Sequence, residues 1–220
     1  MLYYREPLDK GAIVSYENSM KAVVDSMIVS GVLRSDSIIA AFTAIDRKHF
    51  VPKSHEEHIY IDIPLSIGND QTISQPTTVA FMLEHLEVQK GDKVLDIGSG
   101  SGWTTALLCY LVGEEGSVTG LERVDALVEQ GRENIAKIDL PSQCSISKAG
   151  EYLGVPNQQF DRILVSASAD EIPNELFSQL YIGGTLVIPI RESIYKFTKV
   201  SEFEVTEEEF YGFRFVPLVY

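Results

Sequence analysis

Hydrophobic side chains recur every three or four positions in the first quarter of the chain, which is the spacing of amphipathic helices. The first such stripe consists of Met20, Val23, Val24, Met27 and Ile28. It ends at the Ser30-Gly31 pair, and a second stripe over residues 35–46 predicts another helix. Residues 55–76 show no sustained period and contain two prolines and a glycine, so we expect a long ordered loop there.

From residue 77 onward, short apolar runs alternate with helical stripes. The runs predict strands at residues 93–97, 117–121, 143–147, 162–165 and 185–190. The stripes predict helices at residues 79–86, 106–111, 124–135 and 173–180. Because strands alternate with helices, we expect a mostly parallel sheet covered on both faces. Residues 194–220 alternate apolar and polar positions, which favours antiparallel strands. The predicted fold class is α/β, with a doubly wound, mostly parallel, Rossmann-like sheet, an N-terminal helical cap and antiparallel C-terminal edge strands.

Composition narrows the class of partner. Of the 220 residues, 45% are hydrophobic and 23% are charged, the ordinary balance of a globular protein. No apolar run approaches the roughly 20 residues of a membrane span, and the N-terminal stretch lacks the apolar core of a secretory signal. Eighteen basic against 32 acidic residues give a net charge of −14, which disfavours nucleic acid because such a surface repels phosphate. We expect a polypeptide or small-molecule substrate, no membrane association and a cytoplasmic location.

Cysteine and histidine predict no further chemistry. Cys109 and Cys144 each stand alone inside apolar segments, so we expect buried, reduced thiols and neither a disulfide nor a nucleophile. His55-Glu56-Glu57-His58 is similar to a zinc-binding helix motif, but its histidines are three positions apart where the metalloprotease pattern needs four. We expect no metal site.

The strand at residues 93–97 runs into a glycine-rich turn, Asp96-Ile97-Gly98-Ser99-Gly100-Ser101-Gly102. Its three glycines let the backbone turn sharply and approach a ligand, and the following helix directs free N–H groups at that ligand. A dinucleotide site needs its third glycine one place later, where Trp103 stands. Glu122 ends the next strand, where a carboxylate can accept hydrogen bonds from ribose hydroxyls.

This G-x-G-x-G turn after an acidic residue is similar to the first motif of class I methyltransferases. The resemblance implies S-adenosylmethionine as the cofactor and S-adenosylhomocysteine as its product. The cofactor carries a cationic sulfonium and ammonium but no phosphate, so a carboxylate such as Asp96 suits its site. The implied cofactor-binding residues are Asp96, Gly98, Ser99, Gly100, Gly102, Glu122, Ala149, Gly150, Glu151 and Ser166.

Four blocks, in order between about residue 18 and residue 220, resemble the protein-L-isoaspartate O-methyltransferase family. They are Asp62-Ile63-Pro64-Leu65-Ser66-Ile67-Gly68 running into Gln71-Thr72-Ile73-Ser74-Gln75-Pro76, the glycine turn, Val165-Ser166-Ala167-Ser168-Ala169 leading to Ile172-Pro173, and Phe213-Arg214-Phe215-Val216-Pro217-Leu218. The block from Thr72 to Pro76 is the most diagnostic, because methyltransferases in general do not share it.

The family resemblance implies roles on the acceptor side. Ser74, with Thr72 beside it, is the implied catalytic hydroxyl, and it would orient a carboxylate by a hydrogen bond without acting as a nucleophile. The implied substrate-binding residues are Ile73, Pro76, Ala167 and Arg214. A carboxylate acceptor, with an ordinary pKa of about 4, is already ionised at neutral pH and needs no general base. Catalysis then rests on in-line alignment and on removal of water.

The same resemblance divides the chain. We expect an N-terminal extension at residues 1–17 and a single methyltransferase domain at residues 18–220. Within the domain, residues 18–76 form the helical cap and acceptor loop, residues 77–190 the cofactor-binding core, and residues 191–220 the edge strands. A monomer is favoured.

Two departures from the family pattern leave the acceptor open. Lys148-Ala149-Gly150 replaces a Gly-Asp-Gly loop on the adenine side, and Thr77 stands where a histidine is common. The first hypothesis is methylation of L-isoaspartyl residues in damaged proteins, so that the ester can close to a succinimide and be repaired toward aspartate. The second is esterification of the C-terminal or an Asp carboxylate of a ribosomally made biosynthetic peptide. The third is a non-catalytic binding module with the same fold.

Overall fold

The structure is a computed structural model that describes residues 19–140 and 143–220. The predicted N-terminal extension, residues 1–17, lies outside this range. Two helices, α2 (Met20–Val29) and α3 (Asp36–Ala44), open the described chain where the hydrophobic stripes predicted them. Within the described ranges, no helix has both the length and the apolar character that a membrane span requires.

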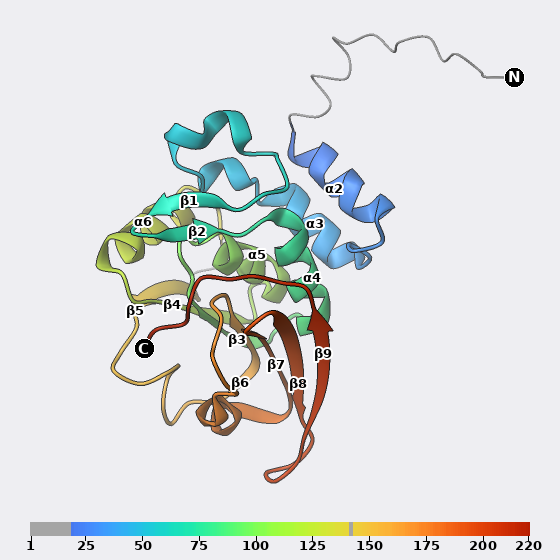
Figure 1. Cartoon of the computed structure of the whole chain (residues 1–220), viewed down its shortest axis with the longest axis vertical. Helices are drawn as coiled ribbons and strands as arrows, with labels where there is room; N and C mark the ends of the chain where they lie inside the picture. Colours follow the sequence, from blue (N-terminus) through green and yellow to red (C-terminus); the bar gives the residue numbers. More distant parts are fainter. Residues whose placement is uncertain (1–18, 141–142) are drawn as a thin grey trace, which may run out of the picture.

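A seven-stranded sheet forms the centre of the domain, in the order β5-β4-β3-β6-β7-β8-β9 (Figure 1). The strands are β3 (Lys93–Ile97), β4 (Ser117–Glu122), β5 (Cys144–Lys148), β6 (Phe160–Val165), β7 (Leu180–Ile190), β8 (Ser193–Lys199) and β9 (Val205–Tyr211). The first five pair in parallel, and β8 and β9 add antiparallel strands at one edge. The chain runs outward from β3 to β5 and then returns to the other side of β3. The predicted fold class is confirmed, and the strand order reverses between β3 and β6, where open α/β sheets bind ligands.

Helices cover one face of this sheet. The helices α4 (Pro76–Leu86), α5 (Trp103–Val112) and α6 (Asp125–Ile135) follow in chain order, and α2 and α3 pack against α4 and α5. One hydrophobic cluster joins these helices to the sheet. Its members include Met27, Phe42, Leu83, Val94, Leu107, Val118, Leu127 and Leu164.

The opposite face has a thinner cover than the predicted doubly wound pattern implies. Its hydrophobic cluster, which includes Leu95, Phe160 and Ile163, is covered by residues 149–158 and by the 3₁₀ helix η3 (Asn174–Gln179). The short helix predicted at residues 173–180 is present as this 3₁₀ helix. Pro156 and a left-handed Gly154, with a φ of 75°, prevent an α-helix between β5 and β6.

Residues 55–76, predicted as a long loop, contain regular structure. A 3₁₀ helix, η2 (Lys53–His58), precedes a two-stranded hairpin of β1 (Leu65–Gly68) and β2 (Gln71–Ile73). Asn69 and Asp70 have φ values of 52° and 57°, and two consecutive residues with positive φ form the turn that matches the twist of a hairpin. Strands of four and three residues are too short to produce a visible period, which is why the prediction of a loop was wrong here.

The prediction of two reduced thiols was also wrong. Cys109 in α5 and Cys144 at the start of β5 form a disulfide, with their Cα atoms 6.0 Å apart. The two residues are 35 positions apart in the sequence, and α5 packs beside β5 in the folded chain. Each cysteine looks isolated in the sequence because only this packing of a helix on a strand brings them together.

Candidate active site

Two cavities lie at the carboxyl ends of the central strands. The first, here called the cofactor cavity, opens beside the glycine turn. It is lined by Gln71, Ile97, Gly98, Leu121, Glu122, Arg123, Ala149, Tyr152, Leu153, Gly154, Ala167, Pro217, Leu218, Val219 and Tyr220. The second, here called the acceptor cavity, lies between the hairpin and the C-terminal segment. It is lined by Pro64, Thr72, Ser74, Gln75, Thr78, Ser166, Arg214, Phe215 and Val216.

The three glycines of the turn differ in what surrounds them. All three have positive φ, between 52° and 88°, which favours glycine at each position. A Cβ on Gly102 would lie 3.1 Å from the carbonyl of Gly131 in α6, and a Cβ on Gly100 would lie 3.3 Å from the side chain of Ile67 in the hairpin. A Cβ on Gly98 would instead point toward Ser166 and Ala167, at 3.8 and 3.9 Å. Gly98 is therefore the glycine that borders the cavities, while Gly100 and Gly102 let neighbouring elements pack closely.

Glu122 ties the turn to the end of β4. Its carboxylate accepts a hydrogen bond from the backbone N–H of Gly100 at 3.0 Å and another from that of Val124 at 2.9 Å. The side chain is buried, with 5% of its surface exposed, yet it lines the cofactor cavity. Its oxygens retain lone pairs for further donors, because a carboxylate accepts about four hydrogen bonds. This geometry fits a ligand that presents neighbouring hydroxyl groups.

Asp96 lies behind the turn and does not line the cofactor cavity. Its side chain is fully buried, and one oxygen accepts a hydrogen bond from the Thr105 hydroxyl at 2.6 Å. Burial raises the pKa of Asp96 to about 7, against the lowering effect of the Thr105 hydrogen bond, and the nearby charge of Glu122 adds to the rise. Within the described chain, the other Asp96 oxygen and the Ser99 hydroxyl have no partner. Unpartnered buried acceptors next to the turn suit a cationic ligand, but direct contact of Asp96 with the cofactor stays a prediction.

The predicted adenine-side loop contributes only in part. Ala149 lines the cofactor cavity, and its N–H donates to the Glu122 carbonyl at 2.8 Å. Gly150 and Glu151 are exposed and do not line the cavity. Tyr152 and Leu153, which the sequence analysis missed, stand on the wall instead. No motif marks them, although an aromatic and an aliphatic side chain directly after the loop are an apolar signal typical of a ring-binding surface.

The C-terminal segment also contributes to the cofactor cavity, which the sequence analysis did not predict. Residues 213–220 cross the carboxyl ends of the strands (Figure 1). The Ser168 N–H donates to the Val216 carbonyl, and the Leu218 N–H donates to the Ser168 carbonyl, both at 2.8 Å. These two bonds fasten the segment beside the loop after β6, so that Leu218 and Tyr220 reach the cavity.

The acceptor cavity brings together four predicted site residues: Thr72, Ser74, Ser166 and Arg214. Among the described residues that line it, Arg214 is the one with a charged side chain. That side chain is 91% exposed and lies 3.9 Å from Glu192, a pairing too open to hold it firmly. Ile73 and Pro76 do not line the cavity, because both are buried behind it, Ile73 in the hydrophobic core and Pro76 at the start of α4.

Three pairs of neighbouring residues separate the two cavities. Gln71 lines the cofactor cavity and Thr72 the acceptor cavity. In the loop after β6, Ala167 lines the cofactor cavity and Ser166 lines the acceptor cavity. In the C-terminal segment, Pro217 lines the cofactor cavity and Val216 lines the acceptor cavity. The two linings therefore meet at three places along the chain, each time across one peptide bond.

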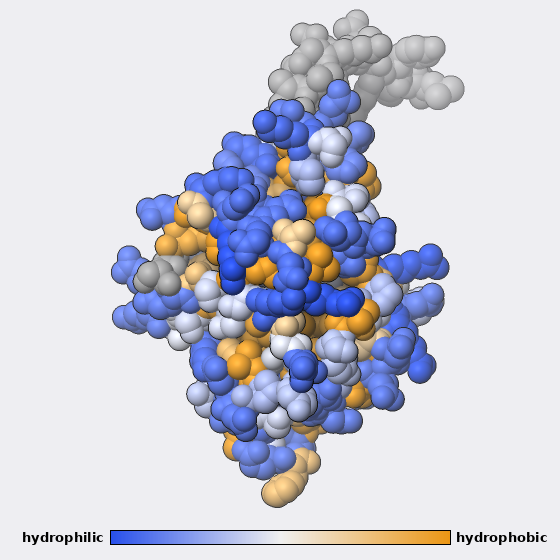
Figure 2. Space-filling model, turned by 90° about the vertical axis from the view of Figure 1, so that its left-hand side faces the viewer, coloured by the Kyte–Doolittle hydropathy of each residue, from blue (hydrophilic) through white to orange (hydrophobic). Residues whose placement is uncertain are grey.

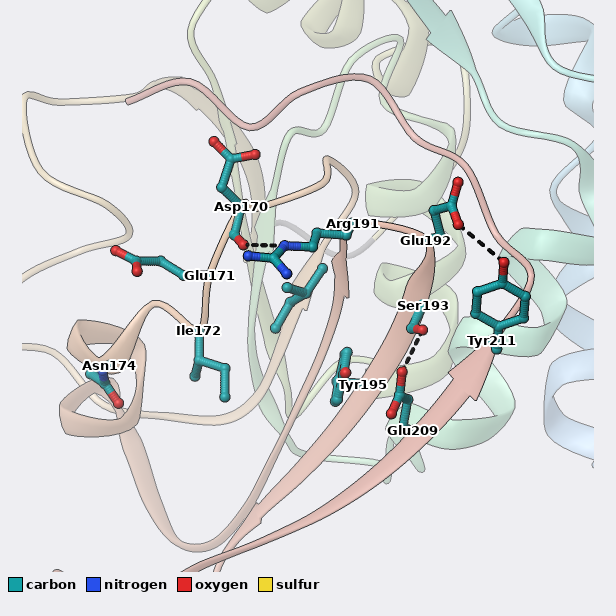
Figure 3. Close-up of a pocket in the computed structure, with 11 residues that line it drawn as sticks. Asp170, Glu171, Ile172, Asn174, Arg191, Glu192, Ser193, Tyr195, Glu209 and Tyr211 are labelled. Carbon is teal, nitrogen blue, oxygen red and sulfur yellow. Dashed lines mark hydrogen bonds between the residues drawn. The ribbon is translucent and has the colours of Figure 1, made fainter.

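A larger hollow, of about 770 Å³, lies at the sheet edge by β8 and β9 (Figure 3). Four carboxylates line it, with Arg191 between them. They belong to Asp170, Glu171, Glu192 and Glu209. Two of these carboxylates already accept hydrogen bonds, Glu209 from Ser193 at 2.6 Å and Glu192 from Tyr211 at 3.1 Å. The four carboxylates make this hollow predominantly acidic, whereas Arg214 gives the acceptor cavity a positive charge.

Hydrophilic side chains are spread over the face seen in Figure 2, with hydrophobic residues between them. Within the described residues, no group of three His, Cys, Asp or Glu side chains has the arrangement of a metal site. The absence of a metal in the enzyme stays a prediction.

Comparison with known proteins gives consistent matches. The family model for protein-L-isoaspartate (D-aspartate) O-methyltransferase matches residues 18–220. A protein-L-isoaspartate O-methyltransferase of Methanococcus maripaludis is 34% identical over 205 residues, covering 92% of this chain and 96% of that protein. The Flavobacterium psychrophilum protein of the same name is 42% identical over 191 residues, covering 85% of this chain and 88% of that protein. Among solved structures, one match is a Plasmodium falciparum protein assigned to this activity, in complex with S-adenosyl-L-homocysteine. Its TM-score is 0.81 and its sequence identity is 29%, and the match covers 92% of this chain and 99% of that chain.

Proposed function

Since the chain belongs to the protein-L-isoaspartate (D-aspartate) O-methyltransferase family, we propose that it methylates the free carboxylate of L-isoaspartyl residues in proteins, with S-adenosylmethionine as methyl donor. The ester is a better electrophile than the carboxylate, so the damaged residue can close to a succinimide and reopen toward aspartate. The enzyme is thus a carboxyl O-methyltransferase of protein repair.

The cofactor cavity fits S-adenosylmethionine by the chemistry of its lining. The cofactor supplies a methyl group on a positively charged sulfur. Glu122, which holds the N–H groups of Gly100 and Val124, would accept hydrogen bonds from the ribose hydroxyls. Leu153 and Tyr152 offer an apolar surface for the adenine ring. The carboxyl of Asp96 is buried behind the turn with a pKa raised to about 7, and a cationic ligand nearby would favour its ionised form.

The acceptor cavity fits a carboxylate. The Ser74 hydroxyl donates a hydrogen bond to one acceptor oxygen and so directs the other toward the methyl group, and Thr72 is in place to support it. The loosely held Arg214 guanidinium provides the positive charge that draws a peptide carboxylate into an otherwise acidic protein.

The reaction needs no general base at this site. The acceptor is ionised at neutral pH, since an ordinary carboxyl has a pKa of about 4. The protein therefore aligns the acceptor oxygen with the methyl group and removes water from that oxygen. In intramolecular model reactions, alignment alone lowers the activation barrier substantially. Pro64, Phe215 and Val216 provide apolar walls for that purpose.

The shared wall between the two cavities is the observation that carries this proposal. At residues 71/72, 166/167 and 216/217, the lining that includes Glu122 gives way to a lining with four hydroxyl side chains and one guanidinium, which supports transfer of a group from one cavity to the other. Transfer of a methyl group requires such adjacency, because the sulfur, carbon and oxygen atoms must lie in line.

A methyl-transfer assay on matched peptides tests the proposal. Three synthetic peptides of one sequence contain L-isoaspartate, L-aspartate, or L-isoaspartate with an amidated C-terminus. We expect turnover of both isoaspartyl peptides and none of the aspartyl peptide. Loss of turnover on amidation would contradict the repair function, because it would show that the enzyme esterifies the peptide C-terminus.

The remaining expectations about partners belong to the same proposal. The substrate is a protein or peptide and not a nucleic acid, and the enzyme acts as a cytoplasmic monomer. The net charge of −14 supports the exclusion of nucleic acid.

A further inference from the structure

Arg47 is a buried cation directly beneath the acceptor loop. It lies in the 3₁₀ helix η1 (Arg47–His49), and none of its surface is exposed. Its Nη1 donates to the carbonyl oxygens of Ile59 at 2.8 Å and Ile61 at 3.2 Å, and its Nη2 donates to those of Ile63 at 2.9 Å and Ser74 at 3.1 Å. One side chain thus holds four carbonyl groups that are spread over residues 59–74.

The match between donors and acceptors is complete at the two terminal nitrogens. Each carries two hydrogens, and each hydrogen has one carbonyl oxygen as its partner. A lysine ammonium has three hydrogens on a single nitrogen and cannot span four carbonyls that converge from two directions. The geometry is specific for a planar guanidinium.

No carboxylate in the described chain pairs with Arg47 within 4.0 Å. Burial lowers the pKa of Arg47 to about 10, partly offset by the charge of Asp62, so the side chain is still charged at neutral pH. The Asp62 carboxylate is occupied elsewhere, by the N–H and the hydroxyl of Thr77 at 2.8 and 2.6 Å. Burying a charge without a paired carboxylate costs solvation free energy. The hydrogen bonds from Arg47 to the four carbonyl oxygens must therefore compensate for this cost.

Arg47 also connects the acceptor loop to the cofactor side. Its guanidinium lies over the ring of Trp103, 5.5 Å from the centroid. Trp103 begins α5 directly after Gly102, and its indole N–H donates to the Ile45 carbonyl at 3.3 Å. A packed route therefore runs from the glycine turn through Trp103 and Arg47 to the backbone of Ser74.

We propose that Arg47 is a positioning residue for methyl transfer: by holding the Ser74 carbonyl and three carbonyls of residues 59–63, it fixes Ser74 in the wall of the acceptor cavity. This inference rests on the proposed function, because Ser74 must orient the acceptor. Arg47 touches neither cavity, so it acts through the loop and not on the reacting atoms.

The variants Arg47→Lys and Arg47→Met test this role, with Glu84→Gln as a matched control. Glu84 is a comparable buried clamp away from the cavities, since it accepts the N–H groups of Arg34 and Ser35 at 2.7 and 2.8 Å and the Ser35 hydroxyl at 2.7 Å. For each variant, thermal stability, affinity for S-adenosylhomocysteine and kcat/KM for the isoaspartyl peptide are measured, together with hydrogen exchange of residues 59–75.

For both Arg47 variants we expect a fall of about 100-fold in kcat/KM, the scale expected when a reacting group is displaced by about 1 Å, with cofactor affinity close to wild type. Exchange should rise at residues 59–75. Glu84→Gln should lose stability and keep kcat/KM and the exchange of that loop.

Parallel loss of stability, cofactor affinity and turnover in both the Arg47 variants and the control would overturn the proposal, because Arg47 would then serve the whole domain. Failure of both Arg47 variants to fold would overturn it for the same reason. If the wild type turns over no isoaspartyl peptide, the proposed function fails, and the exchange comparison still decides whether Arg47 holds the loop: unchanged exchange in Arg47→Lys would refute that hold.

Discussion

Replacement of Glu122 by glutamine removes a buried carboxylate that serves the turn and the proposed ribose site together. In the ligand-free protein, that carboxylate accepts two backbone N–H groups, from Gly100 and Val124. A glutamine amide has one oxygen for these two donors, and its NH₂ group faces the other N–H. One buried donor then loses its partner, which lowers the free energy of unfolding by about 1–3 kcal/mol.

The same substitution weakens cofactor binding. Hydrogen bonds to a charged acceptor contribute about 1.5–3 kcal/mol, and every 1.4 kcal/mol is tenfold in affinity, so Glu122→Gln should bind S-adenosylhomocysteine roughly 10- to 150-fold more weakly. Titration calorimetry gives the affinity and urea denaturation gives the stability of the ligand-free protein. Glu129→Gln is the matched control, because Glu129 lies in α6, is 69% exposed and pairs with Arg132; its affinity should equal that of wild type. If Glu122→Gln lost stability but bound the ligand as wild type does, Glu122 would only shape the turn and the ribose assignment would be refuted.

Three further predictions concern the acceptor, the disulfide and a buried acid. Ser74→Ala should lower kcat/KM for the isoaspartyl peptide about 10- to 100-fold, because one hydrogen bond to a charged group is lost, and should leave the affinity for S-adenosylhomocysteine unchanged. Ser66→Ala, in the facing strand of the hairpin, is the control. Equal effects of the two substitutions would refute the role of Ser74. Cys109→Ala should lower the free energy of unfolding by up to about 4 kcal/mol, because the bond to Cys144 closes a loop of 35 residues and so restricts the unfolded chain. A reductant should produce the same change in wild type but none in the variant. Burial raises the pKa of Asp96 from 3.8 to about 7 in the folded protein, so the stability that the protonated Asp96 contributes is present at low pH and is lost as pH rises through this interval. The free energy of unfolding of wild type minus that of Asp96→Asn should therefore fall from pH 4 to pH 7. A difference that stays constant would contradict the raised pKa.

Local patterns predicted the core of the fold well. The strand at residues 93–97 has the predicted bounds, because a buried parallel strand is a continuous apolar run bounded by polar residues and glycine. The hairpin at residues 65–73 was missed because its strands are too short to show a period. The disulfide was missed because the proximity of Cys109 and Cys144 arises from packing between α5 and β5.

The site shows the same division between local and tertiary information. The glycine turn and Ser74 belong to contiguous motifs, and Glu122 ends a predicted strand. Gly98 and Glu122 line the cofactor cavity and Ser74 lines the acceptor cavity, while the roles of these residues stay predictions. Leu153 and Tyr220 reach the cofactor cavity through the path of a loop and of the C-terminal segment, which no local pattern records. Arg47 is 27 residues from Ser74 in the sequence, so its four carbonyl contacts appear only in the folded chain.

The most direct test of the proposed acceptor uses one peptide that contains an L-isoaspartyl residue, an L-aspartyl residue and a free C-terminus. After incubation with the enzyme and S-adenosylmethionine, tandem mass spectrometry locates the methyl ester among the competing carboxylates. Methylation at the isoaspartyl residue alone is the predicted result. A methyl ester at the C-terminus or at the aspartyl side chain, with the isoaspartyl carboxylate unmodified, would contradict the assignment of this chain to protein repair.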